Sequence, residues 1–427
     1  MSALPDPPAV LAGSPRRSGG LHAAGTSGGR PLLVHLTTAD ISLELLLGPQ
    51  LEAFADAGYD VVGVSAPGRF VERVEARGVR HVALRNATRA MAPHKDLLAI
   101  EELRRLFRDL RPTIVHTHNP KPGLYGRLAA RAAGVPVVVN TVHGLYAMPE
   151  DDWKKRAVVY SLERLASACS DAELVQNPED VVTLREVLRE PASKLVLLGN
   201  GIDLTRFAPP ATDDPVRAAA RAALGVDGSA VVVGAVGRLV REKGYVELFD
   251  AWDRLRAAHP DAVLVVVGPT DGDKADSLPD EVVARAESTG VRFLGMRDDV
   301  HDLYRAMDVY VLASHREGFP RSAMEAAASG LPIVATDIRG CRQVVEHGVT
   351  GLLVEVRSPT ALADALDQLL GDAATRSAMG TAALQRARRH FDQRRIIDTT
   401  LDTYARLLHA RGLDVPVPLT ERNEQAT

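Results

Sequence analysis

The sequence predicts an α/β protein with two parallel-sheet domains, and three observations support this fold class. The chain has 427 residues, which is too long for one ordinary α/β core and suits two. Short β-branched runs alternate with helix-period segments almost from end to end, as in βαβ units. The alternation pauses once, at turn-prone stretches over Asn200–Asp203 and Pro209–Pro215, so the domain boundary is expected near residue 205.

The first domain is expected to span residues 31–205 and to contain seven strands. They are Leu32–Leu36, Val61–Ser65, His81–Leu84, Thr113–Thr117, Val135–Thr141, Glu173–Gln176 and Leu195–Leu198. Helix-period segments such as Leu45–Ala57 and Ile100–Leu110 lie between these runs. Residues 1–30 are rich in Gly, Pro, Ser and Ala, which is typical of a disordered tail.

The second domain is expected to span residues 206–392. Its predicted strands are Ala230–Val236, Ala262–Val267, Val291–Leu294, Val309–Leu312 and Ile333–Ala335. Two helical segments, Arg376–His390 and Arg394–Leu408, then follow each other with no strand between them, so they do not extend a sheet. We therefore expect residues 393–412 to cross back and pack on the first domain, before a tail at 413–427.

The bulk composition excludes several classes of protein. Hydrophobic residues make up 46% and charged residues 25%, and the net charge of −4 gives no reason to expect nucleic acid as a partner. Cys169 and Cys341 are far apart and lack ligand spacing, which argues against disulfides and structural zinc. No apolar run is long enough to span a bilayer, and the start of the chain does not resemble a secretory signal. A cytoplasmic protein, or one at the inner face of a membrane, is expected.

The chemically rich segments all follow predicted strands. They are His116–Gly123, Val142–Gly144, Gly237–Gly244 and Glu317–Glu325. Because ligands bind outside the carboxyl ends of parallel strands, four such segments in two domains imply a shared cleft.

The segment Gly237–Gly244 has the residue types that hold a diphosphate. Two glycines flank Arg238 and Lys243, which supply a forked donor and a compact positive charge. These cations can replace Mg²⁺ on a leaving diphosphate. Taken alone, the segment also fits a solvated charged loop.

The segment Glu317–Glu325 fits both a capping box and an anion site. Ser322 and Glu325 form an S-x-x-E pattern that predicts a helix over Ala323–Ser329. The N-terminus of such a helix also favours a diphosphate, and Gly318 lets backbone amides approach a sugar. Capping alone explains neither Glu317 nor Gly318, which favours a ligand site.

These motifs resemble glycosyltransferase family 4. Glu317 and Glu325, eight positions apart in EGFPRSAME, resemble its E-x7-E element, GRLVREKG resembles its diphosphate loop, and NGID at Asn200–Asp203 resembles its interdomain segment. The resemblance covers residues 31–410. It implies a GT-B fold, with two Rossmann-like domains facing a central cleft, and retaining transfer from a nucleotide diphosphate sugar without metal or cofactor.

The resemblance also assigns roles to individual residues. Arg238 and Lys243 would hold the diphosphate, Glu317 would meet the donor sugar, and Glu325 would bind the ribose hydroxyls. His143 matches the first-domain histidine that reaches the donor sugar, and it completes the predicted catalytic set. The other donor-binding residues implied are Gly237, Gly295, Met296, Gly318, Phe319, Pro320 and Ser322.

The acceptor side departs from the family pattern. Many members carry a Gly-Gly loop after the first strand, whereas Thr37–Ser42 takes that place here without glycine. Thr38, Asp40 and Ser42 are expected to contact the acceptor through side chains. The segment HTHNPKPG resembles that of members that build capsular or lipid-linked polysaccharides, so His118 and Lys121 are expected to meet an acceptor phosphate, unless this segment is a structural loop. No third ligand has suitable spacing for a metal at His116 and His118, and no metal is expected.

A peripheral membrane contact is a further hypothesis. Leu145, Tyr146 and Met148 precede the basic stretch Trp153–Arg156, and aromatic beside basic residues seat helices at anionic interfaces. The alternative is a packed helix with a charged outer face.

The predicted function is transfer of a hexose or N-acetylhexosamine, from a donor that is best taken as a UDP-sugar, to a glycan or polyprenyl-diphosphate-linked sugar. A nucleotide-sugar epimerase and a non-catalytic nucleotide-sugar-binding protein remain as alternatives. A dinucleotide oxidoreductase is disfavoured, because no G-x-G-x-x-G follows the first strand.

Overall fold

A computed structural model describes residues 29–86, 93–118, 120–147, 151–210, 214–270 and 276–416. The predicted tails fall largely outside these ranges, and so do Asn119 and Met148. Residues Pro31–Thr427 form one compact unit.

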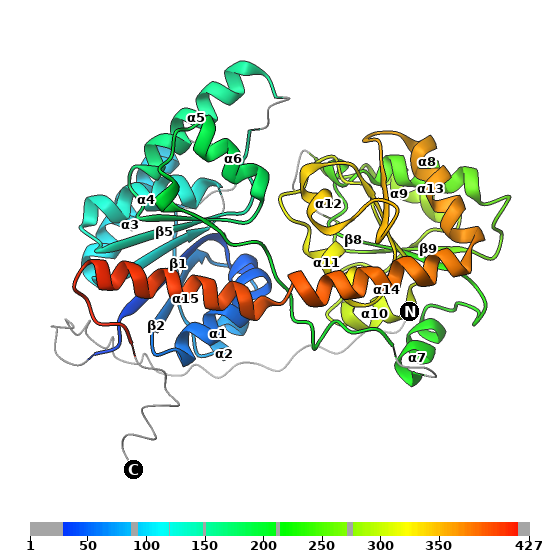
Figure 1. The fold of residues 1–427 in the computed structure, drawn as a ribbon, viewed down its shortest axis with the longest axis horizontal. Coiled ribbons are helices and arrows are strands. Elements are labelled where there is room, and N and C mark those ends of the chain that lie inside the picture. Colours follow the sequence, from blue (N-terminus) through cyan, green and yellow to red (C-terminus); the bar gives the residue numbers. More distant parts are fainter. Residues whose placement is uncertain are drawn as a thin grey trace, which may run out of the picture. The chain divides into compact units, whose positions relative to one another are not determined.

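The first half of this unit is built on a seven-stranded parallel sheet (Figure 1). Its strands are β1 (Leu32–Ala39), β2 (Asp60–Ala66), β3 (Arg80–Ala83), β4 (Ile114–His118), β5 (Val137–Val142), β6 (Ala172–Val175) and β7 (Leu195–Leu197). They lie in the order β3-β2-β1-β4-β5-β6-β7. The order reverses between β1 and β4, which are paired from Leu33 with Ile114 to Leu36 with Thr117.

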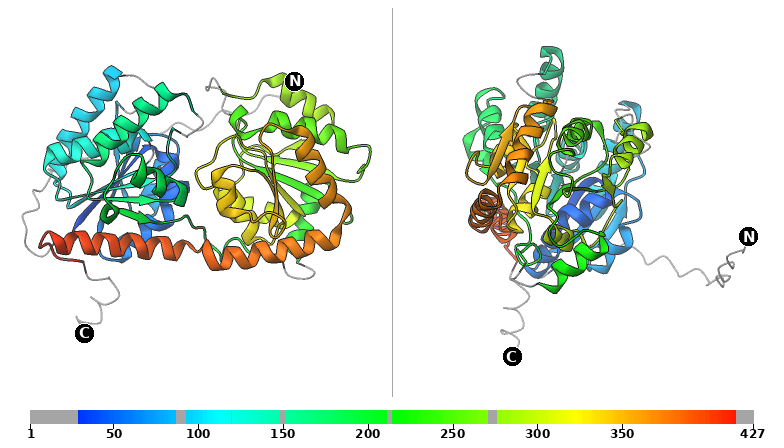
Figure 2. Two further views of the ribbon diagram at one scale, coloured as in Figure 1. Left: turned by 45° about the horizontal axis from the view of Figure 1, so that its top comes forward. Right: turned by 90° about the vertical axis from the view of Figure 1, so that its right-hand side faces the viewer.

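Helices cover both faces of this sheet (Figure 2). They are a π-helical segment (Ser42–Leu47) followed by α1 (Gly48–Asp56), α2 (Val71–Ala76), α3 (Pro93–Leu110), α4 (Pro120–Ala133), α5 (Trp153–Ser167) and α6 (Pro178–Glu186), with a short 3₁₀ turn at Ala192–Lys194. Successive strand residues point to opposite faces, so Leu33 and Val34 are both fully buried but belong to different apolar clusters.

The second half is built on a six-stranded parallel sheet. Its strands are β8 (Val232–Val236), β9 (Val263–Val267), β10 (Arg292–Phe293), β11 (Val309–Leu312), β12 (Ile333–Thr336) and β13 (Gly351–Val354), in the order β10-β9-β8-β11-β12-β13. Its helices are α7 (Pro215–Ala223), a 3₁₀ turn (Arg241–Lys243), α8 (Tyr245–Leu255), α9 (Asp280–Ser288), α10 (Val300–Ala306), α11 (Arg321–Ala328), α12 (Arg339–Val344), α13 (Pro359–Gly371) and α14 (Ala373–His390).

The last helix, α15 (Gln393–Ala410), packs on the first sheet. Tyr404 and Leu408 of this helix are fully buried in the same apolar cluster as Leu33 and Phe54. The chain passes between the halves twice, and the two passages lie side by side. Ile202 on the first passage pairs with Asp392 on the second, and the Ile202 amide donates to the carbonyl oxygen of Phe391 at 2.8 Å.

The predicted fold class is confirmed, including the helix that returns to the first half. All twelve predicted strands are present, with ends shifted by up to three residues, and β13 was not predicted because GLLV has only one β-branched residue. The first strand continues to Ala39, so part of the expected Thr37–Ser42 loop is strand. Among the described helices, none is long and apolar enough to cross a bilayer.

Candidate active site

Each sheet has one point at which its strand order reverses, and the predicted site segments follow the strands there. In the second sheet the reversal lies between β8 and β11. Gly237 directly follows β8, and Ser314–Glu317 follows β11 by one residue. Ligands of open α/β sheets bind in the crevice formed at this place. The fold therefore brings the two predicted donor segments side by side.

Lys243 and Glu317 form an ion pair across this reversal point. Lys243 Nζ donates to Glu317 Oε1 at 2.5 Å, and Ser314 Oγ donates to the same oxygen at 2.8 Å. Gly244, at φ 69°, ends the 3₁₀ turn that carries Lys243, and a Cβ at this position would overlap the carbonyl oxygen of Ala313. Glycine is thus required here for the turn and for close approach to β11.

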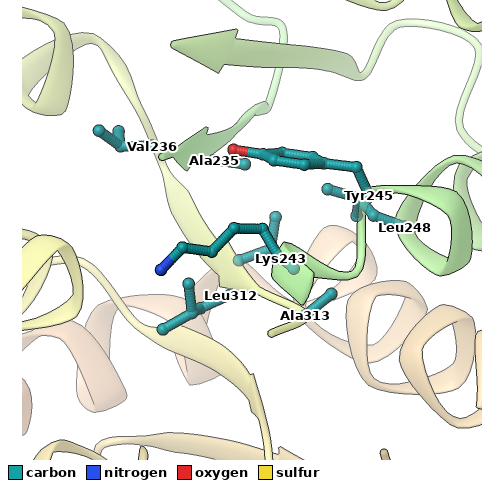
Figure 3. A pocket seen from close by; sticks show the side chains of 8 residues that line it. Ala235, Val236, Lys243, Tyr245, Leu248, Leu312 and Ala313 are labelled. Atoms are coloured by element: carbon teal, nitrogen blue, oxygen red, sulfur yellow. The ribbon is translucent and has the colours of Figure 1, made fainter. Parts of the chain in front are cut away.

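The side chain of Lys243 extends across the ends of β8 and β11 (Figure 3). Tyr245, Val236 and Leu312 line the same hollow, whose volume is about 10 Å³. That volume holds about one water molecule and no sugar. The ammonium group, rather than the hollow, is the feature available to a ligand.

Arg238 and Gly237 complete this segment. The side chain of Arg238 is exposed, and the carbonyl oxygen of Gly237 accepts a hydrogen bond from the Tyr245 hydroxyl at 3.0 Å. The segment is thus anchored through its backbone at Gly237.

The predicted capping box at Ser322 and Glu325 is wrong. Helix α11 begins at Arg321 after Pro320, so Ser322 lies inside the first turn, and the cap residue makes no side-chain hydrogen bond. Glu325 instead accepts a hydrogen bond from Tyr304, whose hydroxyl lies 3.1 Å from Glu325 Oε2. Burial raises the pKa of Glu325, and the charge of Arg321 opposes this shift. The start of α11 is therefore not closed by a side chain of its own, which suits an anion.

The loop Glu317–Pro320 contacts the first half of the chain at several points. A Cβ on Gly318 would overlap the carbonyl oxygen of His143, so this close approach requires glycine. Asn177 Nδ2 donates to the Gly318 carbonyl oxygen at 3.1 Å, and Asn200 Nδ2 donates to the Phe319 carbonyl oxygen at 3.2 Å. The predicted first-domain histidine thus lies against the predicted donor-sugar loop.

A buried ion pair beside this loop was missed by sequence reasoning. Arg339, on α12, forms an ion pair with Asp180, on α6. Its Nη2 donates to the Leu145 carbonyl oxygen at 2.9 Å. Asp180 Oδ2 also accepts from the Leu145 amide at 3.1 Å. Burial raises the pKa of Asp180, and Arg339 opposes the shift. A lone Arg and a lone Asp, 159 positions apart, give no sequence signal for such a pair.

The predicted base-binding residues, Gly295 and Met296, follow β10 at the edge of the second sheet. Gly295 accepts a hydrogen bond from the Gly268 amide at 2.8 Å, and Met296 is 36% exposed. Arg69 of the first half lies 2.6 Å from Met296 Sδ. Met296 therefore presents an accessible apolar surface, and its role stays a prediction.

Two predicted acceptor residues are engaged in contacts of their own. Asp40 is 6% exposed, and its two carboxylate oxygens accept from the amides of Ile41 at 2.9 Å and Phe70 at 2.6 Å. Lys121 is paired with Asp96 at 2.7 Å. An acceptor would compete with these bonds. Thr38, at the end of β1, and Ser42, at the start of the π-helical segment, are half-buried, and their roles stay predictions.

The structure contradicts the expectation that His118 faces an acceptor. Its side chain is 1% exposed, and its ring nitrogens contact His35 at 2.9 Å and His143 at 3.1 Å. The expectation that His116 and His118 lack a third partner was also wrong, since His35 on β1 places a ring nitrogen within 4.8 Å of theirs. Register between β1 and β4, not spacing in the sequence, brings His35 opposite His116.

Burial sets the charge of these histidines. It lowers the pKa of His35 to about 3 and that of His143 to about 4, and it lowers the pKa of His116 and His118 well below the usual value. All four rings are therefore neutral at pH 7.

Two family models match this chain, one in each half. Residues 50–206 match the model described as Glycosyltransferase Family 4, and residues 216–386 match the model described as Glycosyl transferases group 1.

Curated relatives cover most of the chain. A UDP-Gal:alpha-D-GlcNAc-diphosphoundecaprenol alpha-1,3-galactosyltransferase from Escherichia coli is 32% identical over 283 residues, which are 65% of this chain and 71% of that protein. The capsular polysaccharide biosynthesis glycosyltransferase CapM from Staphylococcus aureus is 26% identical over 84% of this chain and 93% of its own.

Solved structures share the fold. HepE from Anabaena, solved in complex with UDP and glucose, superposes with a TM-score of 0.73 at 21% identity over 88% of this chain and 100% of its own. A sucrose-phosphate synthase from Thermosynechococcus elongatus gives a TM-score of 0.75 at 22% identity, over 89% of this chain and 100% of that one. At this level of identity the likeness shows the two-domain fold.

Proposed function

Because the chain belongs to glycosyltransferase family 4 and has the GT-B fold, we propose that it is a retaining glycosyltransferase that uses a UDP-sugar and a lipid-linked sugar acceptor. The observation that carries this proposal is the Lys243–Glu317 pair at the reversal point of the second sheet, beside the open N-terminus of α11.

The donor and acceptor classes are supported by the relatives. The E. coli relative is named for transfer of galactose from UDP-galactose to an N-acetylglucosamine on diphosphoundecaprenol, and HepE was solved with UDP-glucose. We infer a UDP-linked hexose or N-acetylhexosamine as the donor and a polyprenyl-diphosphate-linked sugar or growing glycan as the acceptor.

The proposed mechanism assigns the charge of the leaving diphosphate to protein groups. Arg238, Lys243 and the first amides of α11 stabilise that charge, so no metal or cofactor is required. When the donor enters, Lys243 exchanges its contact with Glu317 for the diphosphate, which leaves Glu317 to bind sugar hydroxyls. The acceptor attacks from the face of the leaving group, and a phosphate oxygen takes its proton.

A binding screen followed by a transfer assay tests this function. Thermal unfolding is followed with nucleotide diphosphates and their sugars, with EDTA present throughout. A selective stabilisation by UDP and one UDP-sugar is expected, because a ligand bound only by the folded state raises stability. The transfer assay then uses a polyprenyl-diphosphate sugar, and proton NMR of the product reports retention at the anomeric carbon.

The alternatives give different outcomes in the same experiments. Conversion of the nucleotide sugar without an acceptor would identify an epimerase, and nucleotide-sugar binding with no turnover would identify a binding protein. A requirement for a divalent ion would contradict the proposed charge stabilisation.

We also propose that α5 rests on an anionic lipid surface. Val158, Leu162 and Leu165 lie on one stripe of this helix and are 60%, 36% and 55% exposed, and Trp153 at its start is 65% exposed. The exposed Lys154 lies beside them. An exposed apolar stripe flanked by cations is typical of helices that lie in the membrane interface.

Liposome sedimentation tests the contact. Vesicles with phosphatidylglycerol should retain the protein more than neutral vesicles, and Trp153→Ser with Leu165→Ser should reduce retention. Val349→Ser, which changes an apolar side chain 48% exposed in the second half, is the matched control. Equal binding by both variants would rule out α5 as the contact.

A further inference from the structure

Four histidines cluster at the reversal point of the first sheet, and three of them, His35, His118 and His143, form a hydrogen-bonded row. His35 lies on β1, His116 and His118 lie on β4, and His143 follows β5. His35 Nδ1 is 2.9 Å from His118 Nε2, and His118 Nδ1 is 3.1 Å from His143 Nε2. His35 and His118 are 0% and 1% exposed, whereas His143 is half-buried and lies against Gly318. The row thus leads from the core to the predicted donor loop.

The buried end of the row determines which nitrogens carry protons. Each neutral ring has one N–H. His35 Nδ1 faces His118 Nε2, and His118 Nδ1 faces His143 Nε2, so the protons of the row run in one of two directions. In the direction toward the donor loop, His118 donates to His143 and accepts from His35.

The His35 end of the row selects this direction. His35 Nε2 is buried and has no hydrogen-bond partner among the described residues. In the direction above, this nitrogen is a bare lone pair. In the opposite direction it would be a buried N–H without an acceptor, which folded proteins rarely tolerate.

We propose that His118 is a positioning residue that holds His143 in the tautomer with its proton on Nδ1, ready to donate to a hydroxyl of the donor sugar. This inference rests on the proposed function and on the predicted contact of His143 with that sugar. With Nδ1 protonated and Nε2 accepting from His118, His143 takes no proton from the acceptor. The row therefore leaves the leaving phosphate oxygen as the group that does so.

The geometry favours hydrogen bonds over a metal ion in this cluster. Two nitrogens on one tetrahedral zinc, each about 2.0–2.1 Å from the ion, lie roughly 3.3 Å apart. The 2.9 Å between His35 and His118 is a hydrogen-bond distance. The rings of His116 and His118 stack with centroids 4.2 Å apart, so their in-plane lone pairs do not converge on one point. His116 already contacts Tyr404 and, at 2.7 Å, Thr141.

Two variants of nearly equal size at position 118 test the proposal. In His118→Asn the amide donates to His143 in place of Nδ1–H, whereas His118→Leu has no donor. Leu should lower kcat about 10- to 100-fold, as for other residues that orient an active group. Asn should restore most of that loss, and the acceptor KM should stay the same in both. Tyr404→Phe is the control, because it removes a hydrogen bond to His116, which does not contact His143 in the row.

Proton–nitrogen NMR of the histidine rings reports the tautomer without any turnover. In the parent protein and in His118→Asn, His143 should carry its proton on Nδ1, and in His118→Leu this preference should be lost. Equal activity of the Asn and Leu variants, an unprotonated Nδ1 in the parent, or stoichiometric metal in protein purified without chelator would each overturn the proposal. Absence of transfer by the parent protein would instead defeat the proposed function, while the NMR result would still decide the tautomer.

Discussion

The reversal points of the two sheets have opposite electrostatic character. Beside β8 and β11 lie ionised groups, and the side chains of Lys243 and Glu317 keep 22% and 12% exposure. Beside β1 and β4 lie neutral imidazoles, and burial lowers their pKa. In the proposed function, the same position in a parallel sheet meets a charged leaving group in one half and an uncharged sugar in the other. This difference teaches that the fold supplies the place, and the side chains decide which part of a substrate is met there.

The largest expected effect is on the charged side. Lys243→Ala should lower kcat about 100- to 1,000-fold, because one preorganised donor to developing charge contributes this much in other enzymes. Steady-state kinetics with the UDP-sugar identified by the screen measures the loss. Arg241→Ala changes an exposed cation two residues earlier on the same turn and should have little effect. Equal losses in both variants would show that the effect comes from the overall charge of the loop and not from Lys243 itself.

The next effect is on the neutral side and depends on pH. The folded-state pKa values of His35 and His143, about 3 and about 4, lie below that of an unfolded histidine, so the unfolded state binds protons first as the pH falls. These neutral histidines therefore make their full contribution to the free energy of unfolding above pH 6.5, and that contribution is lost as the pH falls toward 4. Between pH 7.5 and 5 each of these two histidines should lower the free energy of unfolding by about 2 kcal/mol, or about 4 kcal/mol together.

Urea denaturation at several pH values measures this loss. His35→Gln keeps a hydrogen-bonding group that does not titrate, so its free energy of unfolding should fall less over the same range. Parallel curves for the parent and the variant would show that His35 is not held neutral.

The smallest expected effect is on the free energy of unfolding and concerns Asp40, which follows β1. Asp40→Ala removes a buried carboxylate from the Ile41 and Phe70 amides and should lower the free energy of unfolding by about 1.5–3 kcal/mol. Asp56→Ala, an exposed aspartate at the end of α1, is the control. A higher acceptor KM without lost stability would instead favour the predicted acceptor role of Asp40.

The charged side was predictable from the sequence, and the neutral side was not. Glu317 and Lys243 lie in short motifs whose spacing is set by local turns, so each motif is visible within ten residues. His35 and His118 are 83 positions apart and meet through strand register, which no local pattern reveals. The parallel sheets follow from alternation of strands and helices, whereas the pairing of Arg339 with Asp180 depends on how the halves meet. One local prediction is wrong, at Ser322, because the helix begins at Arg321 after Pro320, two residues before the predicted start.

The return of α15 to the first sheet has a consequence for how the protein is made. Leu33, Phe54 and Tyr59 are covered by Tyr404 and its neighbours, which follow the whole second half in the chain and leave the ribosome after it. One face of the first domain therefore stays uncovered throughout synthesis of the second, and an apolar surface of this kind promotes aggregation. A chain that stops before residue 393 should be retained by chaperones, because the face of the first sheet that α15 covers stays exposed.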